Sequence, residues 1–356
     1  MTILRNFALL LPKLRRLREA RDALLLERDA LLLDRHALLQ ERDTIGRESA
    51  AREAELALWR NRAASRFFHY NACFDPEEVI RRHAVPDLAP RPGYLTNFLG
   101  VIIDPKFFPT ILGDRAGLVE SMPIPANWHA DIAEWGAALR AVDLARHRFT
   151  IVELGCGWGC WLNNAGVAAR RAGLSVHLIG VEGDRGHLGF AEEAIATNGF
   201  RASEYTLHHG IASATPGTAL FPSQDQAGLH WGLEPVFHAT EAQWEAAKRS
   251  GEYEILPMLH LADVVAQHSR VDLLHVDIQG GEVDLVEGSL PLLREKVAYL
   301  LTGTHSRVIE GRLCTALHQS GWTLEIERPA ILDPNNLTGP VVVDGVQAWR
   351  NPTLLS

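Results

Sequence analysis

The stretch VELGCGWG, residues 152–159, decides which fold this chain is predicted to adopt. The β-branched and apolar residues from Phe149 to Val152 predict a buried parallel strand just before it. Glycines then occupy three alternate positions, and the small residues from Asn164 to Ala172 predict a helix. A strand, a glycine turn and a helix form the first unit of a nucleotide-binding α/β fold, because glycine permits both a tight turn and close approach of a ligand to the backbone.

The glycine spacing separates two kinds of cofactor. The dinucleotide fingerprint needs glycines at relative positions 1, 3 and 6, whereas the sixth position here is Cys160 and the third glycine, Gly159, stands one place earlier. With Glu153 in front, the pattern resembles motif I of the class I S-adenosylmethionine (SAM) methyltransferases. The resemblance implies a SAM-binding loop made of Glu153, Gly155, Cys156, Gly157 and Gly159. A glycine turn that binds no ligand is the alternative.

A second acid supports this interpretation. The apolar run that starts at Ser175 ends in Glu182, 23 residues beyond Gly159, which suits one helix and one strand. A carboxylate at such a strand end can accept hydrogen bonds from the ribose hydroxyls of a bound adenosine. An NAD enzyme would share this acid but not the glycine spacing. We add three neighbours to the predicted cofactor site: Gly183, Gly210 and Ile211.

Composition limits the class of protein. The chain has 356 residues, of which 47% are hydrophobic and 22% are charged, as expected of a soluble globular protein. Its net charge of −9 argues against a nucleic-acid partner. The four cysteines form no CxxC pair and no zinc spacing, so we assign no metal ligands and expect a reducing, cytoplasmic location.

The N-terminal part, residues 1–64, is predicted to be a helical arm. From Arg21 the sequence repeats every seven residues as RDALLLE, RDALLLD, RHALLQE and RDTIGRE, which indicates a coiled coil. One register places Ala23, Ala30 and Ala37 at position a, with Leu26 and Leu33 at position d. Because the apolar face needs a partner, we expect a homo-oligomer, with the body of the protein as the alternative partner.

Residues 1–18 are basic, with no acid among them. The apolar run from Phe7 to Leu11 is too short to span a bilayer. Peripheral contact with the inner face of an anionic membrane is one interpretation of this segment, and a solvated helix start is the other.

Residues 65–127 contain eight prolines, from Pro76 to Pro125, together with many aromatic residues. Because proline interrupts helices, this segment is predicted to be irregular. We expect this segment to pack on a catalytic domain, residues 128–356, either as a wall of the substrate pocket or as structural cladding. A helix is predicted over 125–144, with residues 127–129 near the cofactor loop. A hairpin is predicted around residues 216–217, and the aromatic-rich insertion 224–257 is a candidate lid, with a purely structural role equally favoured.

Several ordered motifs in residues 130–330 resemble the FkbM family of SAM-dependent methyltransferases. The stretch VDLLHVDIQGGE, residues 271–282, is similar to the family pattern I-D-L-(I/L)-K-I-D-V-E-G-x-E. The chain departs from this pattern at His275 in place of Lys, at Gln279 in place of Glu and at Gly303 in place of a later Glu. The resemblance implies an α/β, Rossmann-like class I fold: a seven-stranded mixed sheet with helices on both faces, preceded here by the N-terminal coiled-coil helix.

The implied activity is methyl transfer from SAM to an acceptor hydroxyl. The acceptor would be a small molecule or a glycan: a sugar hydroxyl of a surface polysaccharide or lipid-linked glycan, or a secondary metabolite. The catalytic candidates, in order as general base, are His305, Asp277 and His275. Asp277 has an alternative role, in which it holds the SAM amine or a metal. His305 also has one, in which it only forms a hydrogen bond with a backbone carbonyl. The alternatives are a SAM-binding but catalytically degenerate module organised by its coiled coil, and a nicotinamide oxidoreductase.

Overall fold

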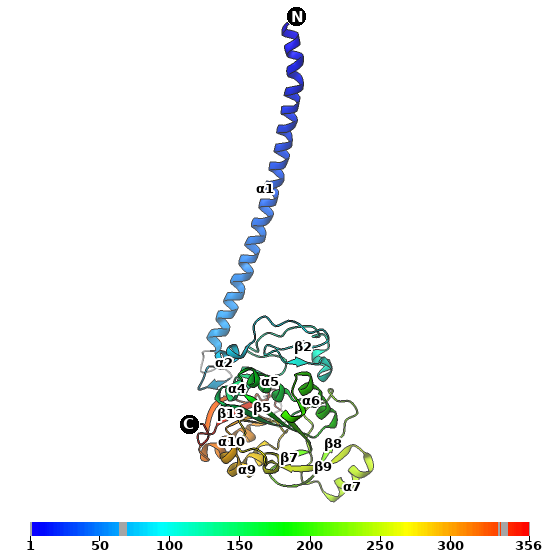
Figure 1. Cartoon of the computed structure of the whole chain (residues 1–356), viewed down its shortest axis with the longest axis vertical. Coiled ribbons are helices and arrows are strands. Elements are labelled where there is room, and N and C mark those ends of the chain that lie inside the picture. Colours follow the sequence, from blue (N-terminus) through cyan, green and yellow to red (C-terminus); the bar gives the residue numbers. More distant parts are fainter. Residues whose placement is uncertain (1, 64–69, 334, 336–340, 356) are drawn as a thin grey trace. The chain divides into compact units, whose positions relative to one another are not determined.

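A computed structural model describes residues 2–63, 70–333, 335 and 341–355. The chain divides into two compact units, Met1–Phe68 and His69–Ser356. Within the described residues, the first unit is one helix, α1 (Thr2–Ala63), of 62 residues (Figure 1). The leucines at the d positions of the predicted register are exposed, since Leu26 keeps 73% of its surface and Leu33 keeps 72%. Pairing of α1 with a second copy of the chain stays a prediction.

The second unit is built on a mixed sheet with the strand order β1-β12-β13-β11-β10-β4-β5-β6. Seven of these strands are those predicted, and the two-residue edge strand β1 (Asn71–Ala72) is an addition. β4, β5, β6, β10 and β11 run parallel, and β13 is antiparallel to both β11 and β12. The bounds of the seven are β4 (Arg148–Leu154), β5 (Ser175–Glu182), β6 (Tyr205–His209), β10 (Leu273–Val276), β11 (Tyr299–Thr304), β12 (Thr323–Arg328) and β13 (Gly345–Arg350).

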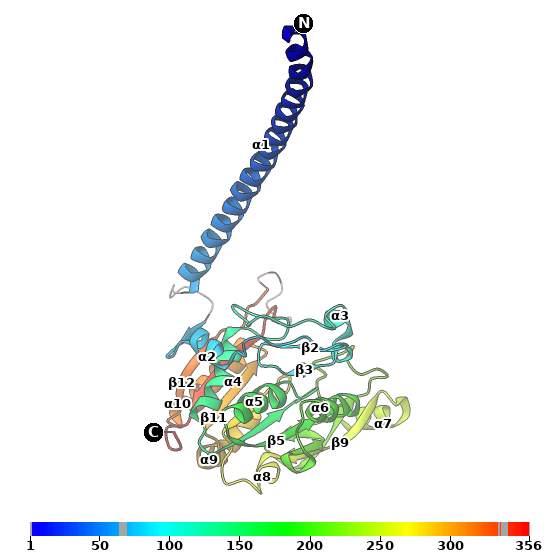
Figure 2. The ribbon, with the colours of Figure 1, turned by 45° about the horizontal axis from the view of Figure 1, so that its top comes forward.

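Helices cover both faces of this sheet, as predicted (Figure 2). Alternate residues of the central strands enter two separate cores: Ile151 packs on one face and Val152 on the other. The first core includes α4 (Ile132–Leu144), α5 (Cys160–Arg171) and α6 (Arg185–Thr197). The second includes α8 (Leu261–Val264), α9 (Glu282–Lys296) and α10 (Arg307–Gln319). A parallel sheet buried on both faces explains why its strands read as apolar runs.

The segment before α4 belongs to the same unit as the sheet. Its short elements are α2 (Pro76–His83), β2 (Leu95–Thr96), β3 (Ile102–Ile103), the 3₁₀ helix η1 (Pro105–Phe107) and α3 (Pro109–Leu112). Phe98 lies edge-on to Trp135 of α4, with ring centroids 5.0 Å apart, and Phe107 stacks on Trp158 at 5.6 Å. Phe98 and Phe107 are therefore part of the first hydrophobic core.

The predicted helix over 125–144 begins later than expected, at Ile132. Asp131 is its N-cap, because its carboxylate accepts hydrogen bonds from the backbone N–H groups of Ala133 and Glu134. The residues before it turn around Asn127, whose side-chain oxygen accepts from the N–H groups of His129 and Ala130. Side-chain acceptors thus hold residues 127–130 in a turn instead of a helix.

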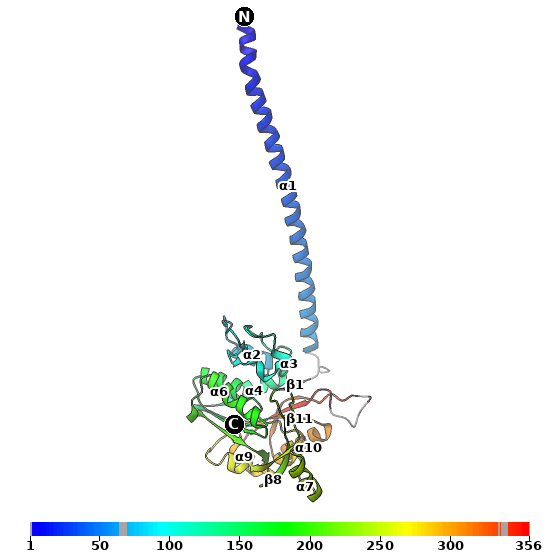
Figure 3. The same ribbon diagram turned by 90° about the vertical axis from the view of Figure 1, so that its right-hand side faces the viewer.

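The predicted hairpin around residues 216–217 is wrong. β7 (Ile211–Ser213) and β8 (Gly217–Pro222) do not pair with each other, because β9 (Tyr253–His260) lies between them. β9 is parallel to β7 and antiparallel to β8. The insertion that separates β8 from β9 contains α7 (Glu241–Ser250) (Figure 3).

Candidate functional site

A cavity of about 550 Å³ lies at the carboxyl ends of the parallel strands, within the size range of small-molecule sites. Its walls come from the loop after β4, the ends of β5 and β10, the turn before α4 and the insertion after β8. Nine of the predicted cofactor residues line it: Glu153, Gly155, Cys156, Gly157, Glu182, Gly183, Gly210, Ile211 and Asp277. Gly159 instead starts α5 as its N-cap. These nine residues therefore belong to one cavity, and their predicted role in cofactor binding stays a prediction.

The three glycines after β4 all need the conformation that only glycine adopts easily. Their φ angles are +74° at Gly155, +53° at Gly157 and +74° at Gly159. A Cβ atom at Gly155 would overlap the carbonyl oxygen of Asp277, and one at Gly157 would lie 2.8 Å from the Trp231 ring. The loop thus presents backbone without side chains to the cavity, and it lies against the segments that contain Asp277 and Trp231.

Glu153 joins this loop to the helix that follows it. Its carboxylate oxygens accept hydrogen bonds from the backbone N–H groups of Trp161, at 3.2 Å, and Leu162, at 2.9 Å. An acid is favourable at this place because the N-terminus of a helix carries partial positive charge. Burial raises the pKa of Glu153 to about 8, against the two hydrogen bonds, which lower it.

Glu182 links the glycine loop to the end of β5. One carboxylate oxygen accepts a hydrogen bond from the N–H of Gly157 at 2.8 Å, and the other accepts from the N–H of Asp184 at 2.7 Å. Burial raises the pKa of Glu182 to about 7. A carboxylate oxygen has more than one lone pair, so Glu182 retains capacity to accept from a ligand hydroxyl in the cavity.

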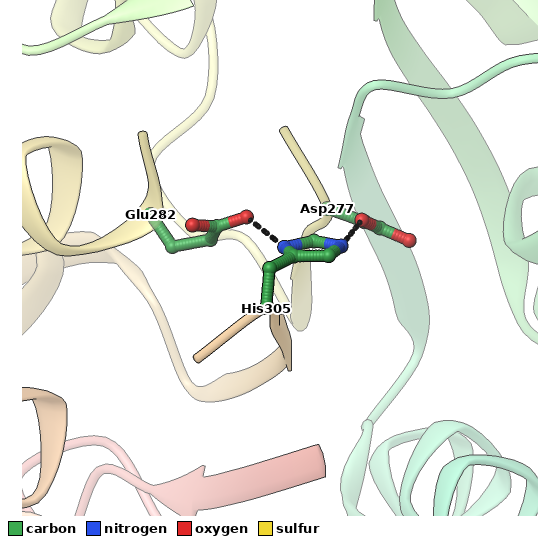
Figure 4. Close-up of side chains that lie close together, drawn as sticks. All are labelled: Asp277, Glu282 and His305. Carbon is green, nitrogen blue, oxygen red and sulfur yellow. Dashed lines mark hydrogen bonds and ion pairs between the residues drawn. The ribbon is translucent and has the colours of Figure 1, made fainter. Parts of the chain in front are cut away.

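Asp277, Glu282 and His305 form a hydrogen-bonded triad (Figure 4). Because β10 and β11 are parallel neighbours, Asp277 after the one strand comes beside His305 after the other. The Nε2 atom of His305 lies 3.2 Å from Asp277 Oδ1, and its Nδ1 atom lies 2.7 Å from Glu282 Oε1. The three residues are also close enough together to share a metal ion. Since the two ring nitrogens are directed at opposite carboxylates, we assign the arrangement to hydrogen bonding.

The triad fixes the charge of the histidine. Burial lowers the pKa of His305, but the hydrogen bonds and charges of Asp277 and Glu282 outweigh burial and raise the pKa to about 10. Burial raises the pKa of Asp277, but the hydrogen bond and charge of His305 outweigh burial, so the pKa of this carboxyl is lowered. His305, the first of the predicted bases, is therefore an imidazolium near neutral pH and has no free lone pair. Asp277 is the ionised member that also lines the cavity.

Two other histidines and an acid surround the same end of the cavity. Burial lowers the pKa of both His275 and His129 to about 4, so both are neutral. His275 is buried, and neither of its ring nitrogens has a hydrogen-bond partner among the described residues. Burial raises the pKa of Glu134 to about 8. Neither His129 nor Glu134 was predicted as a site residue, although residues 127–129 were expected near the cofactor loop.

The insertion and the segment before α4 complete the walls. Trp231, Gly232, Leu233 and Pro235 of the insertion line the cavity, as does Phe108. The other aromatic residues that made the insertion a candidate lid, Phe237, Trp244 and Tyr253, are not among the lining residues. Of the aromatic residues of the insertion, Trp231 is therefore the one that lines the cavity among the described residues.

The sheet order, the glycine loop after its first central strand and the acid after its second define a class I methyltransferase fold. Residues 145–310 match the model of the Methyltransferase FkbM domain. A protein of Jannaschia sp. (strain CCS1) described as "Putative methyltransferase" is 47% identical over 266 residues, which are 74% of this chain and 94% of that protein. The chain belongs to the FkbM family of methyltransferases.

Solved structures with a similar fold include methyltransferase FkbM from Methylobacillus flagellatus KT. It is 13% identical, with a TM-score of 0.37, over 61% of this chain and 54% of that chain. A ribosomal protein L11 methylase from Lactobacillus delbrueckii subsp. bulgaricus is 14% identical, with a TM-score of 0.32, over 62% of this chain and 80% of that chain. Among the described residues, no helix has a stretch apolar enough, over a sufficient length, to cross a membrane.

Proposed function

We propose that this methyltransferase uses SAM and methylates a hydroxyl group of a sugar or glycan, or of a secondary metabolite. Membership of the FkbM family supports methyl transfer. The observation that supports SAM is the cradle formed by the glycine loop and Glu182, which are joined by the 2.8 Å hydrogen bond from Gly157. The loop offers backbone without side chains, and the acid beside it offers an acceptor for ribose hydroxyls.

The chemistry of the cavity fits the proposed cofactor. SAM carries a cationic sulfonium, and when bound it would supply the methyl group. The carboxyl groups of Glu153, Glu182 and Asp277 line the cavity. The pKa of Asp277 is lowered, and the negative charge of this carboxylate would favour a cation there. A Cβ at Gly155 or Gly157 would meet neighbouring atoms, so any larger residue would narrow the cradle. The chain itself would hold the donor and the acceptor in attack geometry, which can be worth about 7–11 kcal/mol.

Asp277 is our first candidate for the group that accepts the proton of the acceptor hydroxyl, and His275 is the second. Asp277 is an ionised carboxylate in the cavity wall, and the imidazolium of His305 holds it in place through the 3.2 Å contact. His305 thus acts through Asp277. His275 is the second candidate, because its ring nitrogens are neutral and without hydrogen-bond partners in the described structure. A positioned base typically contributes about 10²–10⁴ in rate.

The surroundings of the enzyme are proposed from the sequence. We propose a homo-oligomer held by the coiled coil of residues 1–64, a cytoplasmic location and peripheral membrane contact through residues 1–18. The heptad repeat and its exposed leucines support the first. The side chains of residues 1–15 lie outside the described part of the structure, so the membrane contact is based on their basic composition alone.

Calorimetry with SAM and a methyl-transfer assay test the proposal together. The full chain should bind SAM, and Glu182→Ala should weaken binding by an order of magnitude or more, because the ribose acceptor and the anchor of Gly157 are both lost. Glu192→Ala, at an exposed position of α6, is the matched control. Radiolabelled SAM should then transfer its methyl group to a glycan fraction from cells lacking the gene.

Two results would redirect the assignment. Binding of SAM without transfer to any acceptor would favour the degenerate module, which the departures at His275, Gln279 and Gly303 motivate. Absence of SAM binding would contradict the proposal, and NAD binding in its place would favour an oxidoreductase.

A further inference from the structure

Trp231 is the middle ring of a three-ring stack. Its indole is 3.8 Å from the His187 ring at an interplanar angle of 2°, and 4.2 Å from the Phe108 ring at 14°. His187 belongs to α6, Trp231 to the insertion after β8, and Phe108 to the segment between η1 and α3. Three stretches that are distant in the sequence therefore meet at this tryptophan.

Hydrogen bonds fix the same arrangement. The Nε1–H of Trp231 donates to the carbonyl oxygen of Gly228 at 3.2 Å, and the N–H of Gly228 donates to Nε2 of His187 at 3.3 Å. Gly228 has no space for a side chain, since a Cβ there would lie 2.9 Å from the carbonyl oxygen of Phe107. The ring is thus held by two stacking partners and by its own backbone turn.

This ring lies directly on the glycine loop. A Cβ at Gly157 would be 2.8 Å from Cζ3 of Trp231, and both residues line the cavity. Gly157 is the residue whose N–H binds Glu182, so Trp231 covers the point where the loop and the proposed ribose acceptor meet. The cavity of about 550 Å³ remains with Trp231 in this position. The indole is therefore a wall of the cavity and does not fill it.

We propose that Trp231 is a cofactor-positioning residue, which holds SAM against Gly157 and slows its release. This inference rests on the proposed function. Because His187 and Phe108 cover the two faces of the indole, the ring presents its edge to the cavity, where it would pack against the bound cofactor and exclude water from it. Packing against His187 and Phe108 keeps the ring in place before the cofactor arrives, so little ordering entropy is lost on binding.

Full-length variants test the role of Trp231 through the affinity and dissociation rate of SAM. Trp231→Ala should raise the Kd about tenfold, because apolar packing against the cofactor is lost, and the change should appear mainly as faster dissociation in stopped-flow measurements. Trp231→Phe keeps an aromatic ring and should retain most of the affinity. Trp244→Ala is the matched control, because Trp244 lies on α7 of the same insertion but does not line the cavity; its Kd should equal that of the wild type.

His187→Ala gives a second, independent test, since it removes one stacking partner and the acceptor for Gly228 while leaving Trp231 in the chain. Its dissociation rate should rise, and combining it with Trp231→Ala should add little. If Trp231→Ala binds SAM as tightly as Trp244→Ala, the inference is overturned while the proposed function stands. If the wild type binds no SAM, the proposed function fails and this inference with it. If circular dichroism shows that Trp231→Ala does not fold, the test uses Trp231→Phe and His187→Ala. A faster dissociation of SAM from His187→Ala than from Trp231→Phe then supports the inference, and equal rates overturn it.

Discussion

Gly155 and Gly173 have similar backbones and very different surroundings, which allows the cost of a side chain in the loop to be measured. Their φ angles are +74° and +82°. A Cβ at Gly155 would overlap the Asp277 carbonyl oxygen, whereas one at Gly173 would meet nothing within 4 Å. Gly173→Ala should cost about 1–2 kcal/mol of the free energy of unfolding, from backbone conformation alone. Gly155→Ala should cost more than twice as much and abolish SAM binding.

Urea denaturation and calorimetry on the two variants check this prediction. Equal losses of stability, or SAM binding that survives Gly155→Ala, would show that the close approach of the loop to Asp277 is not required.

His305 predicts a pH dependence of stability. Its pKa is raised to about 10 in the folded chain from an ordinary value of 6.5. The folded state therefore keeps a proton between these values that the unfolded state releases. The stabilisation is fully present below pH 6.5 and is lost as the pH rises toward 10. His305→Gln should cost about 3 kcal/mol at pH 6, because the buried Glu282 loses its cationic partner.

The difference between wild type and His305→Gln should shrink steadily in urea denaturations from pH 6 to pH 9. His318→Gln, at an exposed position of α10, is the control and should show no such trend. A difference that is constant with pH would mean that His305 is neutral in the folded protein.

Among the residues that line the cavity, the sequence predicted those that come directly after a strand. The glycine loop and Glu182 follow directly from the strands that they terminate, and both line the cavity. His129, Glu134 and Trp231 could not be predicted in the same way, because long-range packing brings them to the loop. The charge of His305 was also out of reach, since it depends on contact with Glu282 on another element.

At the scale of elements, apolar runs predicted the central strands, and the errors arose where polar contacts or chain pairing decide. β4 and β5 are buried nearly throughout, which makes their sequence pattern clear. The start of α4 was misplaced because the side chain of Asn127 holds a turn that helix periodicity does not reveal. The hairpin was wrong because the partner of β7 and β8 lies beyond the insertion, more than 30 residues away in the sequence.

The start of α5 should depend on Glu153. Glu153→Ala would leave the N–H groups of Trp161 and Leu162 without their acceptor in a buried place, at a cost of about 1–3 kcal/mol. Glu153→Gln keeps one acceptor oxygen and should cost less. Because α5 begins directly after the glycine loop, the Ala variant should also weaken SAM binding. Urea denaturation and calorimetry measure both effects; equal stability of the two variants would exclude the amide contact as the cause.

At the scale of the whole molecule, the chain combines a catalytic unit with a 62-residue helix in which most of the described leucines, Leu26 and Leu33 among them, are exposed. An isolated helix of this composition would leave a large apolar surface in water, which favours association. Residues 69–356 contain both hydrophobic cores around the sheet, so removal of α1 leaves those cores intact. Assembly and catalysis should therefore be separable.

Light scattering on the full chain should show an oligomer, and removal of residues 1–63 should yield a monomer that still binds SAM. Leu26→Glu with Leu33→Glu places charges at two d positions of the proposed register and should dissociate the full chain as well. Arg28→Glu with Arg35→Glu, at charged positions of the same repeats, is the matched control and should leave the apolar contacts in place. If the truncated and full-length chains have the same oligomeric state, the heptads do not drive assembly, and their leucines must be covered by another partner.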